Sequence, residues 1–238
     1  DAGAVFTLDC PQTPADTILM VGSCRAVPYL NYFKRIIDSG AALSVHFIEP
    51  WNNHWNPATG DMWDFEAALI RCEKDERILA VLKSATILIS EWYQNAGMFN
   101  TDPDAEKNLF KFGCSPRVRV TLPNFHDRFI LMTEQIQFDS EKQAAFREHG
   151  MTNELFDRMK DFGLAQIEGF CDVCQMSSFP EFAQQFRENW KRRRYFWKGN
   201  HISRHFSCEL FKLMNDRFLN LPLSEGFWRD AYGEDLFS

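Results

Sequence analysis

Short apolar runs and amphipathic stretches alternate along the first half of the chain. Four runs rich in strand-forming residues predict β-strands at 17–21, 43–48, 86–90 and 118–122. Between them, apolar residues recur at three- and four-residue spacing, which predicts helices over 27–37 and 61–83. Alternating strands and helices are typical of a parallel sheet flanked by helices, so the pattern predicts an α/β fold.

The second half of the chain has mainly helical periodicity. It predicts helices over 140–149, 152–174, 179–193 and 204–219, with a last short strand at 195–197. No internal repeat, low-complexity segment or linker interrupts the 238 residues. We therefore expect a single α/β domain over residues 1–238 with a helix-rich C-terminal half.

Composition narrows the classes of function. The 23 Phe, 7 Trp and 5 Tyr residues make up 15% of the chain and predict a core of packed rings or a cleft lined by them. A net charge of −7 argues against nucleic acid as a partner, and no apolar run is long enough for a membrane span. The first ten residues have no signal-peptide pattern, and the seven cysteines have no framework spacing, so we expect a cytoplasmic protein.

The turn Gly22-Ser23-Cys24-Arg25 is the first candidate site, because it follows the first strand and precedes a helix. Ligands of open α/β sheets bind outside the carboxyl ends of the strands. The amides and the dipole at a helix N-terminus stabilise an anion, so Cys24 in this place would have a lowered pKa. The alternative is a tight strand-to-helix turn with a small buried thiol.

A second candidate is the turn over residues 198–203, which lies between the last short strand and a helix. His201 there has the chemistry of a general base, with Asn200 beside it, and His205 is the competing choice one helical turn later. The alternative is that Asn200 or Ser203 caps the helix and His201 is a neighbour of the cap.

Two further polar turns also follow predicted strands. Gln94 and Asn95 come after the third strand and would complete an oxyanion hole, and Asn124 follows the fourth strand. Each turn alone is a weak signal. Their common position at strand ends favours a site at one edge of the sheet.

Other features favour structural explanations. Cys171 and Cys174 have the spacing of a redox or zinc pair, but no second pair accompanies them, and in a helix such cysteines pack as small hydrophobic residues. The basic run at 191–194 is explained by a solvated helix end, or by a grip on an anionic ligand. The Trp-rich segment 51–55 is a candidate lid or an aromatic plug, and His46 lies within a predicted strand.

In their order along the chain, these turns resemble the motifs of the WcbI-type polysaccharide biosynthesis proteins, which are similar to the wider SGNH (GDSL) hydrolase and acyltransferase group. The resemblance extends over about residues 17–220 and rests on Gly-Ser-Cys-Arg at 22–25, Tyr-Gln at 93–94, Leu-Pro-Asn-Phe at 122–125 and Asn-His-Ile-Ser at 200–203. It implies a flavodoxin-like parallel sheet and an acyl-transfer site at the first strand-to-helix turn.

The resemblance also implies roles for single residues. Cys24 takes the place of the nucleophile, Ser23 is a rival hydroxyl, and His201 takes the place of the base. SGNH enzymes have an aspartate three residues before the histidine, where this chain has Lys198. A carboxylate that orients the imidazole would then come from another loop, with Glu91 or Asp127 as candidates.

We therefore expect an acyltransferase or esterase-like enzyme that acts on a sugar or glycan hydroxyl in polysaccharide biosynthesis. An acyl-coenzyme A donor is implied by the resemblance alone, with Arg25 or the run 191–194 meeting its phosphates, and no metal is expected. The alternative is a non-catalytic ligand-binding or assembly module that kept the fold without a full triad, and Lys198 favours this alternative.

Overall fold

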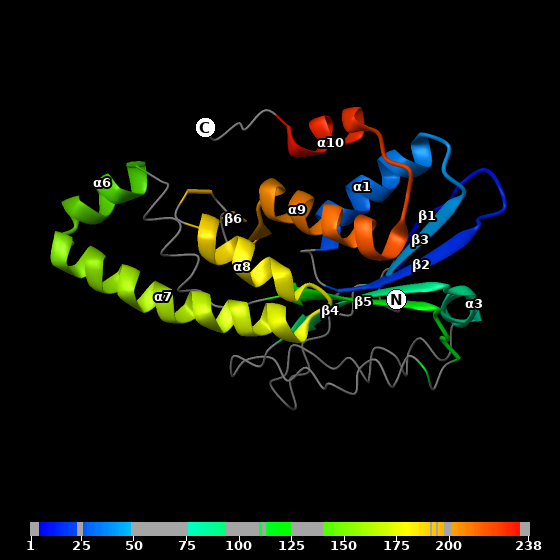
Figure 1. Cartoon of the computed structure of the whole chain (residues 1–238), viewed down its shortest axis with the longest axis horizontal. Helices are drawn as coiled ribbons and strands as arrows, with labels where there is room; N and C mark the ends of the chain where they lie inside the picture. Colours follow the sequence, from blue (N-terminus) through cyan, green and yellow to red (C-terminus); the bar gives the residue numbers. More distant parts are fainter. Residues whose placement is uncertain are drawn as a thin grey trace. The chain divides into compact units, whose positions relative to one another are not determined.

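The computed structural model describes residues 5–22, 26–48, 76–93, 110, 113–124, 140–190, 192–193, 195–197 and 201–233 (Figure 1). The chain divides into two compact units, Asp1–Leu122 and Pro123–Ser238. The expectation of one domain over the whole chain stays a prediction.

The first unit contains a mixed, mostly parallel sheet with the strand order β1-β3-β2-β4-β5. Its strands are β1 (Val5–Leu8), β2 (Asp16–Val21), β3 (Leu43–Ile48), β4 (Ile87–Tyr93) and β5 (Val118–Asn124). β2 pairs in parallel with β3 and with β4. β5 starts beside the start of β4, where Arg117 donates its backbone N–H to the carbonyl oxygen of Thr86. The predicted α/β class and its four central strands are confirmed.

Both faces of the central strands are covered by side chains of the first unit. The described helices of this unit are α1 (Val27–Asp38) and α3 (Glu76–Ser84). Leu19 of β2 and Leu88 of β4 are fully buried in a cluster with Ile78 of α3. Met20 and its register partner Phe47 point to the opposite face and are also buried, on the side where α1 packs against β3. Near-continuous burial of this kind explains why the strands are uniformly apolar in the sequence.

The order of the parallel strands reverses next to β2. From β2 the chain passes through α1 to β3 on one side, while β4 pairs with β2 on the other side. In open α/β sheets, the carboxyl ends of the strands at such a reversal border the ligand site. The ends of β2 and β4 are therefore the candidate ligand site of this unit.

β1 was not predicted from the sequence. It runs antiparallel to β3 at the edge of the sheet, and Phe6 on it is half exposed. The Thr7 hydroxyl lies 3.1 Å from Nδ1 of His46 on β3. Burial lowers the pKa of His46, against the opposing effect of Asp9. His46 thus lies within the sheet, as its place in an apolar strand indicates.

The second unit is mainly helical. Its described elements are α6 (Ser140–Glu148), α7 (Asn153–Met176), α8 (Pro180–Asn189), β6 (Phe196–Trp197), β7 (His201–Ile202), α9 (Arg204–Met214), the π-helix η2 (Asn215–Leu219) and α10 (Glu225–Tyr232). α7 and α8 lie side by side (Figure 1). The helix-rich second half is confirmed, whereas β7 and α10 are additions to the prediction.

Aromatic rings form the core of the second unit. Phe170 of α7 lies edge-to-face with Phe186 of α8, with 4.6 Å between the ring centroids. Phe182 and Phe206 are 5.0 Å apart, and Tyr195 is 4.9 Å from Phe186. All five rings are fully or almost fully buried. In this unit the aromatic richness of the sequence therefore produces a packed core.

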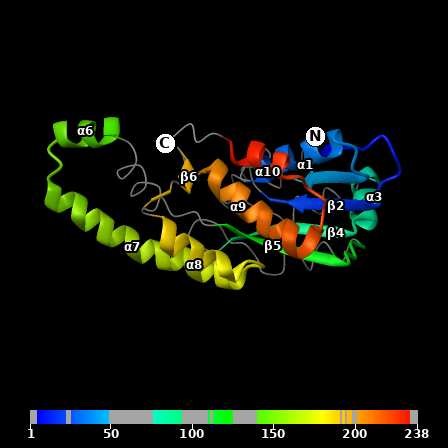
Figure 2. The ribbon, with the colours of Figure 1, turned by 45° about the horizontal axis from the view of Figure 1, so that its top comes forward.

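The predicted helix over 204–219 changes character at Asn215. There α9 gives way to the π-helix, in which Asn220 donates its backbone N–H to the carbonyl oxygen of Asn215, five residues earlier. The buried Asn215 amide also bonds the backbone N–H and carbonyl of Leu221, at 3.0 and 3.1 Å. α10 then packs back against α9, with Phe211 6.1 Å from Trp228 (Figure 2).

Candidate functional site

The carboxyl ends of β2 and β4 bring a glycine and a carboxylate together. Val21 is in register with Ser90, so the next residues, Gly22 and Glu91, are neighbours. A Cβ atom added to Gly22 would lie 2.8 Å from Cδ and 3.0 Å from Oε2 of Glu91. The Glu91 side chain therefore lies directly against the backbone of Gly22, at the point where the strand order reverses.

Gly22 is required here for space. Its φ is not among the positive values, which belong to other glycines, so the backbone conformation itself would accept a side chain. Gly22 is buried and donates its backbone N–H to the carbonyl of Ile48, at 3.3 Å. The structure thus identifies Glu91 as the group that lies against Gly22.

α1 begins at Val27, five residues after Gly22. Its N-cap residue, Ala26, is buried and offers no side-chain acceptor, and Pro28 lies in the first turn. The first turn contains no acidic residue. Since the first amides of a helix have no partner within the helix, this end favours a negatively charged group.

Most residues of the predicted site lie outside the described part of the chain. These are Ser23, Cys24 and Arg25 in the first turn, Gln94 and Asn95 after β4, and Asn200. For Asn124 and His201 the structure describes the backbone only, in β5 and β7. The order β2-β4-β5 brings the ends of three neighbouring strands to one edge of the sheet. That the turns after these strands converge stays a prediction.

The fourth predicted turn belongs to the second unit. His201 pairs with Trp197 across the two-stranded ribbon of β6 and β7. Ser203 caps α9, where its hydroxyl accepts the backbone N–H of Phe206 at 3.0 Å. The capping role that the sequence offered for Ser203 is confirmed. The proposed catalytic role of His201 stays a prediction.

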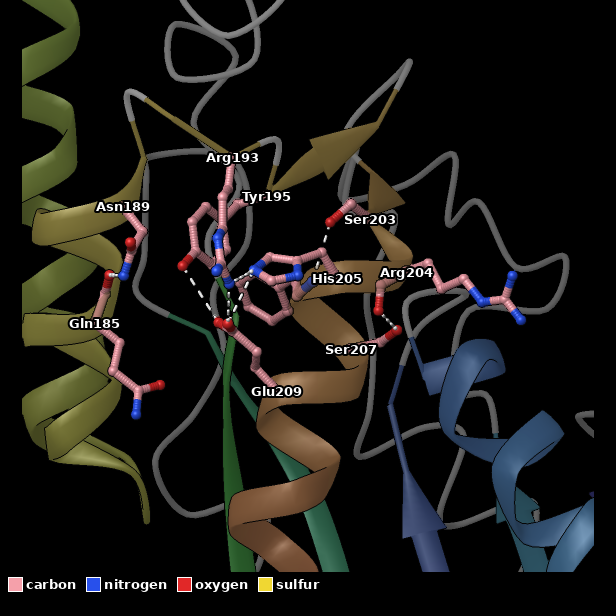
Figure 3. A network of polar contacts seen from close by, with 10 residues as sticks. Gln185, Asn189, Arg193, Tyr195, Ser203, Arg204, His205, Ser207 and Glu209 are labelled. Carbon is pink, nitrogen blue, oxygen red and sulfur yellow. Dashed lines mark hydrogen bonds and ion pairs between the residues drawn. The ribbon is translucent and has the colours of Figure 1, made fainter. Parts of the chain in front are cut away.

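A cluster of polar side chains around Glu209 lies in the second unit and was not predicted as a site (Figure 3). Oε1 of Glu209 lies 2.9 Å from Nε2 of His205 and 3.1 Å from Nη1 of Arg193. The hydroxyl of Tyr195 donates to Oε2, at 3.2 Å. The side chains of His205 and Glu209 are 20% and 15% exposed, so this is a mostly buried carboxylate with two hydrogen-bond donors, Arg193 and Tyr195, and with His205 at ion-pair distance. We call these four residues the Glu209 cluster.

Two aromatic rings border the Glu209 cluster. The ring of Tyr195 lies 5.4 Å from that of His205, and the ring of Tyr232 on α10 lies 6.3 Å from it. Burial, together with Cys208 and Glu209, raises the pKa of Tyr232 to about 12, so its hydroxyl is neutral at physiological pH.

One sequence signal for this cluster existed. His205 and Glu209 are four residues apart within a predicted helix, a spacing that places two side chains on the same face. Arg193 and Tyr195 could not be assigned to it, because they lie outside that helix. The basic run at 191–194 was predicted to be a solvated helix end or a grip on an anionic ligand; Arg193 is exposed and also pairs with Glu209. Arg192 is exposed.

The Cys171 and Cys174 pair is part of the core. Both side chains are fully buried in α7, and the Cys171 thiol donates to the carbonyl of Ala183 at 3.5 Å. Burial raises the pKa of Cys171 to about 11 and also raises that of Cys174. Among the described residues, no three His, Cys, Asp or Glu side chains meet in a way that could hold a metal ion. None of the described helices has the length and apolar character needed to cross a bilayer.

Comparison of the chain with protein-family models, with curated proteins and with solved structures finds no match. Its function is therefore argued from its own residues.

Proposed function

We propose that the chain is an acyl-transfer enzyme, an acyltransferase or esterase, whose site lies at the carboxyl ends of β2 and β4. The observation that carries this proposal is the Glu91 carboxylate packed against Gly22 where the strand order reverses. Ligands of open α/β sheets bind at this edge, and the small Gly22 leaves room there for the Glu91 carboxylate, which a larger residue at position 22 would displace. This arrangement indicates a built site. In the sequence, Ser23 and Cys24 follow Gly22 directly.

The chemistry of the turn suits a covalent acyl intermediate. Cys24 is the proposed nucleophile and Ser23 the rival. The first turn of α1 contains no acidic residue, and the positive end of the helix dipole stabilises a thiolate and the oxyanion that forms when it attacks. Gln94 and Asn95 are proposed as further oxyanion donors, with Asn124 and Asn200 on the substrate side.

Glu91 meets one requirement of the missing orienting carboxylate, which is its position beside the turn. It lies against Gly22, the residue that precedes Ser23 and Cys24, and its proposed role there is that of a hydrogen-bond acceptor for a hydroxyl of the substrate. The proposed acceptor is accordingly a sugar or glycan hydroxyl in polysaccharide biosynthesis. The resemblance indicates His201 as the base, and the finer fold type, flavodoxin-like and SGNH-like, is proposed on the same grounds.

A coenzyme A thioester is the proposed acyl donor. The acid-free N-terminal turn of α1 fits a phosphate group. Arg192 and Arg193 are both exposed, and Arg193 also pairs with Glu209. Arg25 or the run at 191–194 is the proposed phosphate contact. A reducing, cytoplasmic setting is proposed because the five described cysteines are free thiols.

The test measures acetyl transfer from acetyl-coenzyme A to a panel of sugars, together with hydrolysis of p-nitrophenyl acetate. Cys24→Ala should lower the rate at least about 100-fold, since the covalent step is lost, and Glu91→Gln should raise KM for the sugar. Cys10→Ala and Glu76→Gln are matched controls in the same unit, because Cys10 is half-buried and Glu76 is exposed.

Unchanged rates in both Cys24→Ala and Ser23→Ala would refute acyl transfer through this turn. Sugar binding without any turnover in the wild type would instead support the non-catalytic ligand-binding or assembly module. Thiol alkylation separates the two cases early, because an activated Cys24 reacts well below pH 8 and a structural thiol does not.

A further inference from the structure

The helix α10 buries little of its own surface within the second unit. Ala231 is its one buried residue. Phe227 and Trp228 are partly buried, and their rings lie 6.4 and 6.1 Å from that of Phe211 on α9 (Figure 2). A helix of eight residues is too short to be stable by itself in water. The position of α10 therefore depends on its contacts with α9.

Arg204, the first residue of α9, holds the C-terminal end of α10. Its Nε donates to the carbonyl oxygen of Ala231 and its Nη2 to that of Asp230, both at 2.8 Å. These carbonyls belong to the last turn, whose oxygens receive no hydrogen bond from within the helix. Gly233 follows α10 and lies close to the guanidinium, since a Cβ atom there would be 2.9 Å from Cζ of Arg204. Two charge-assisted hydrogen bonds thus fix this end of α10 to another helix.

The N-terminal end of α10 has a fixed point just before it. The buried Asn215 amide bonds the backbone N–H and the carbonyl of Leu221, at 3.0 and 3.1 Å. Pro222, which is exposed, and Leu223, which is partly buried, lie between Leu221 and the N-cap residue Ser224. A movement of α10 about residues 222–224 would therefore leave Leu221 and Asn215 in place.

Tyr232, the last residue of α10, lies over a thiol and an imidazole of α9. Cys208 is fully buried, and a side-chain hydrogen bond joins it to Tyr232. The ring of Tyr232 also lies 6.3 Å from that of His205. Tyr232 itself is 37% exposed, so α10 is the outer of the two helices at this point. Removal of α10 would expose the Cys208 thiol.

We propose that α10 is a strap that opens about residues 222–224 while the rest of the second unit stays folded, and that Arg204 holds it closed. The strap controls the access of solvent and reagents to Cys208. Opening breaks the two hydrogen bonds of Arg204 and separates Tyr232 from Cys208. It exposes much less apolar surface than unfolding of the aromatic core does, so it requires less free energy. The inference concerns the second unit alone and does not depend on the acyl-transfer function.

The experiment measures the alkylation of single cysteines by iodoacetamide in the native full chain at about pH 8, with each labelled peptide quantified by mass spectrometry. Cys208 should react at least about tenfold faster than Cys171 and Cys174, which are fully buried in α7 and become accessible only on unfolding. The labelling rate of Cys208 should also rise less steeply with urea, because a local opening exposes less surface.

Two variants test the role of Arg204. Arg204→Met keeps an unbranched side chain and removes both donors, so it should speed the labelling of Cys208 at least about fivefold. Gly233→Ala crowds the guanidinium and should act in the same direction. Arg229→Met is the matched control, because it removes an exposed arginine of α10 itself, and it should leave the rate unchanged.

The two α7 cysteines report in each variant whether the unit is folded, since their slow labelling should persist. Equal rates and equal urea dependence for Cys208 and Cys171 in the wild type would show that α10 opens only when the unit unfolds, and would overturn the strap. Labelling of Cys208 at the wild-type rate in both Arg204→Met and Gly233→Ala would overturn the role of Arg204.

Discussion

Gly22→Ala should disturb the candidate site far more than the fold. The new Cβ would lie 2.8 Å from Cδ of Glu91, whereas ordinary contacts begin at 3.4 Å, so the carboxylate must move by at least 0.6 Å (3.4 minus 2.8). Crowding a packed position costs about 1–3 kcal/mol. Here the cost should be near the lower end, because Glu91 is flexible and only partly buried.

A second effect offsets part of this cost. Alanine restricts the unfolded chain more than glycine does, and where the native backbone accepts it, the substitution stabilises by about 0.4–1 kcal/mol. Gly22 has no positive φ, so this gain applies. We expect a net change within about 1 kcal/mol in the free energy of unfolding. A carboxylate misplaced by that distance can nevertheless lower a rate about 100-fold.

A double-mutant cycle isolates the contact. Urea unfolding is measured for the wild type, Gly22→Ala, Glu91→Ala and the double variant, and acetyl transfer is measured for the same four proteins. In the Glu91→Ala background, Gly22→Ala should be neutral or stabilising, which gives a coupling free energy of about 1 kcal/mol. An identical effect of Gly22→Ala in both backgrounds would show that the two residues do not touch, and the site argument would lose its basis.

Two further predictions concern the second unit. Gly233→Ala should destabilise by about 1–3 kcal/mol in thermal unfolding, because Gly233, which follows α10, has φ +71° and a Cβ there would lie 2.9 Å from Cζ of Arg204. Gly226→Ala within α10, where a Cβ would meet only a 3.6 Å contact, should be neutral or stabilising by up to about 1 kcal/mol. Equal effects of the two substitutions would contradict the packing. Cys171 and Cys174 should resist iodoacetamide at pH 8 in the native protein. Rapid labelling at pH 8 would refute the buried position. The pKa of Cys171 in the folded protein is raised to about 11, above its unfolded value. Its contribution to stability is therefore present below about pH 9 and is lost as the pH rises toward 11, which urea unfolding measured across that range tests.

The parts of the fold that sequence reasoning predicted are those with a continuous apolar signal. β2, β3 and β4 are buried on both faces and therefore form continuous apolar runs in the sequence. On β5, Val120 and Leu122 are buried whereas Arg119 is exposed, so this strand alternates. β1 has no such signal, because it is an edge strand with the exposed Phe6 in its centre. The change from α- to π-helix at Asn215 depends on hydrogen bonds to Leu221, a loop residue whose position no periodicity in the helix encodes.

The candidate site also combines a residue with a local sequence signal and a residue that only strand pairing brings to it. Gly22 was identifiable, because a glycine at a strand end implies close approach, but its partner Glu91 is 69 residues away in the chain (91 minus 22) and becomes a neighbour only through strand pairing. The residues between Gly22 and α1 carry the proposed nucleophile and remain predictions. Pairings across the sheet thus supply what a local motif cannot.

The carboxylate that would orient a catalytic histidine is a clear example of a group that a local motif does not supply. A turn motif with aspartate three residues before the histidine places both groups on one loop, and Lys198 at that position excludes the arrangement for His201. A helix offers another solution, since residues four apart share a face, and Glu209 binds His205 in this way. Arg193 and Tyr195 hold the carboxylate from outside α9. The chain therefore pairs an imidazole with a carboxylate without a loop aspartate, so the loss of that aspartate does not by itself indicate a non-catalytic protein.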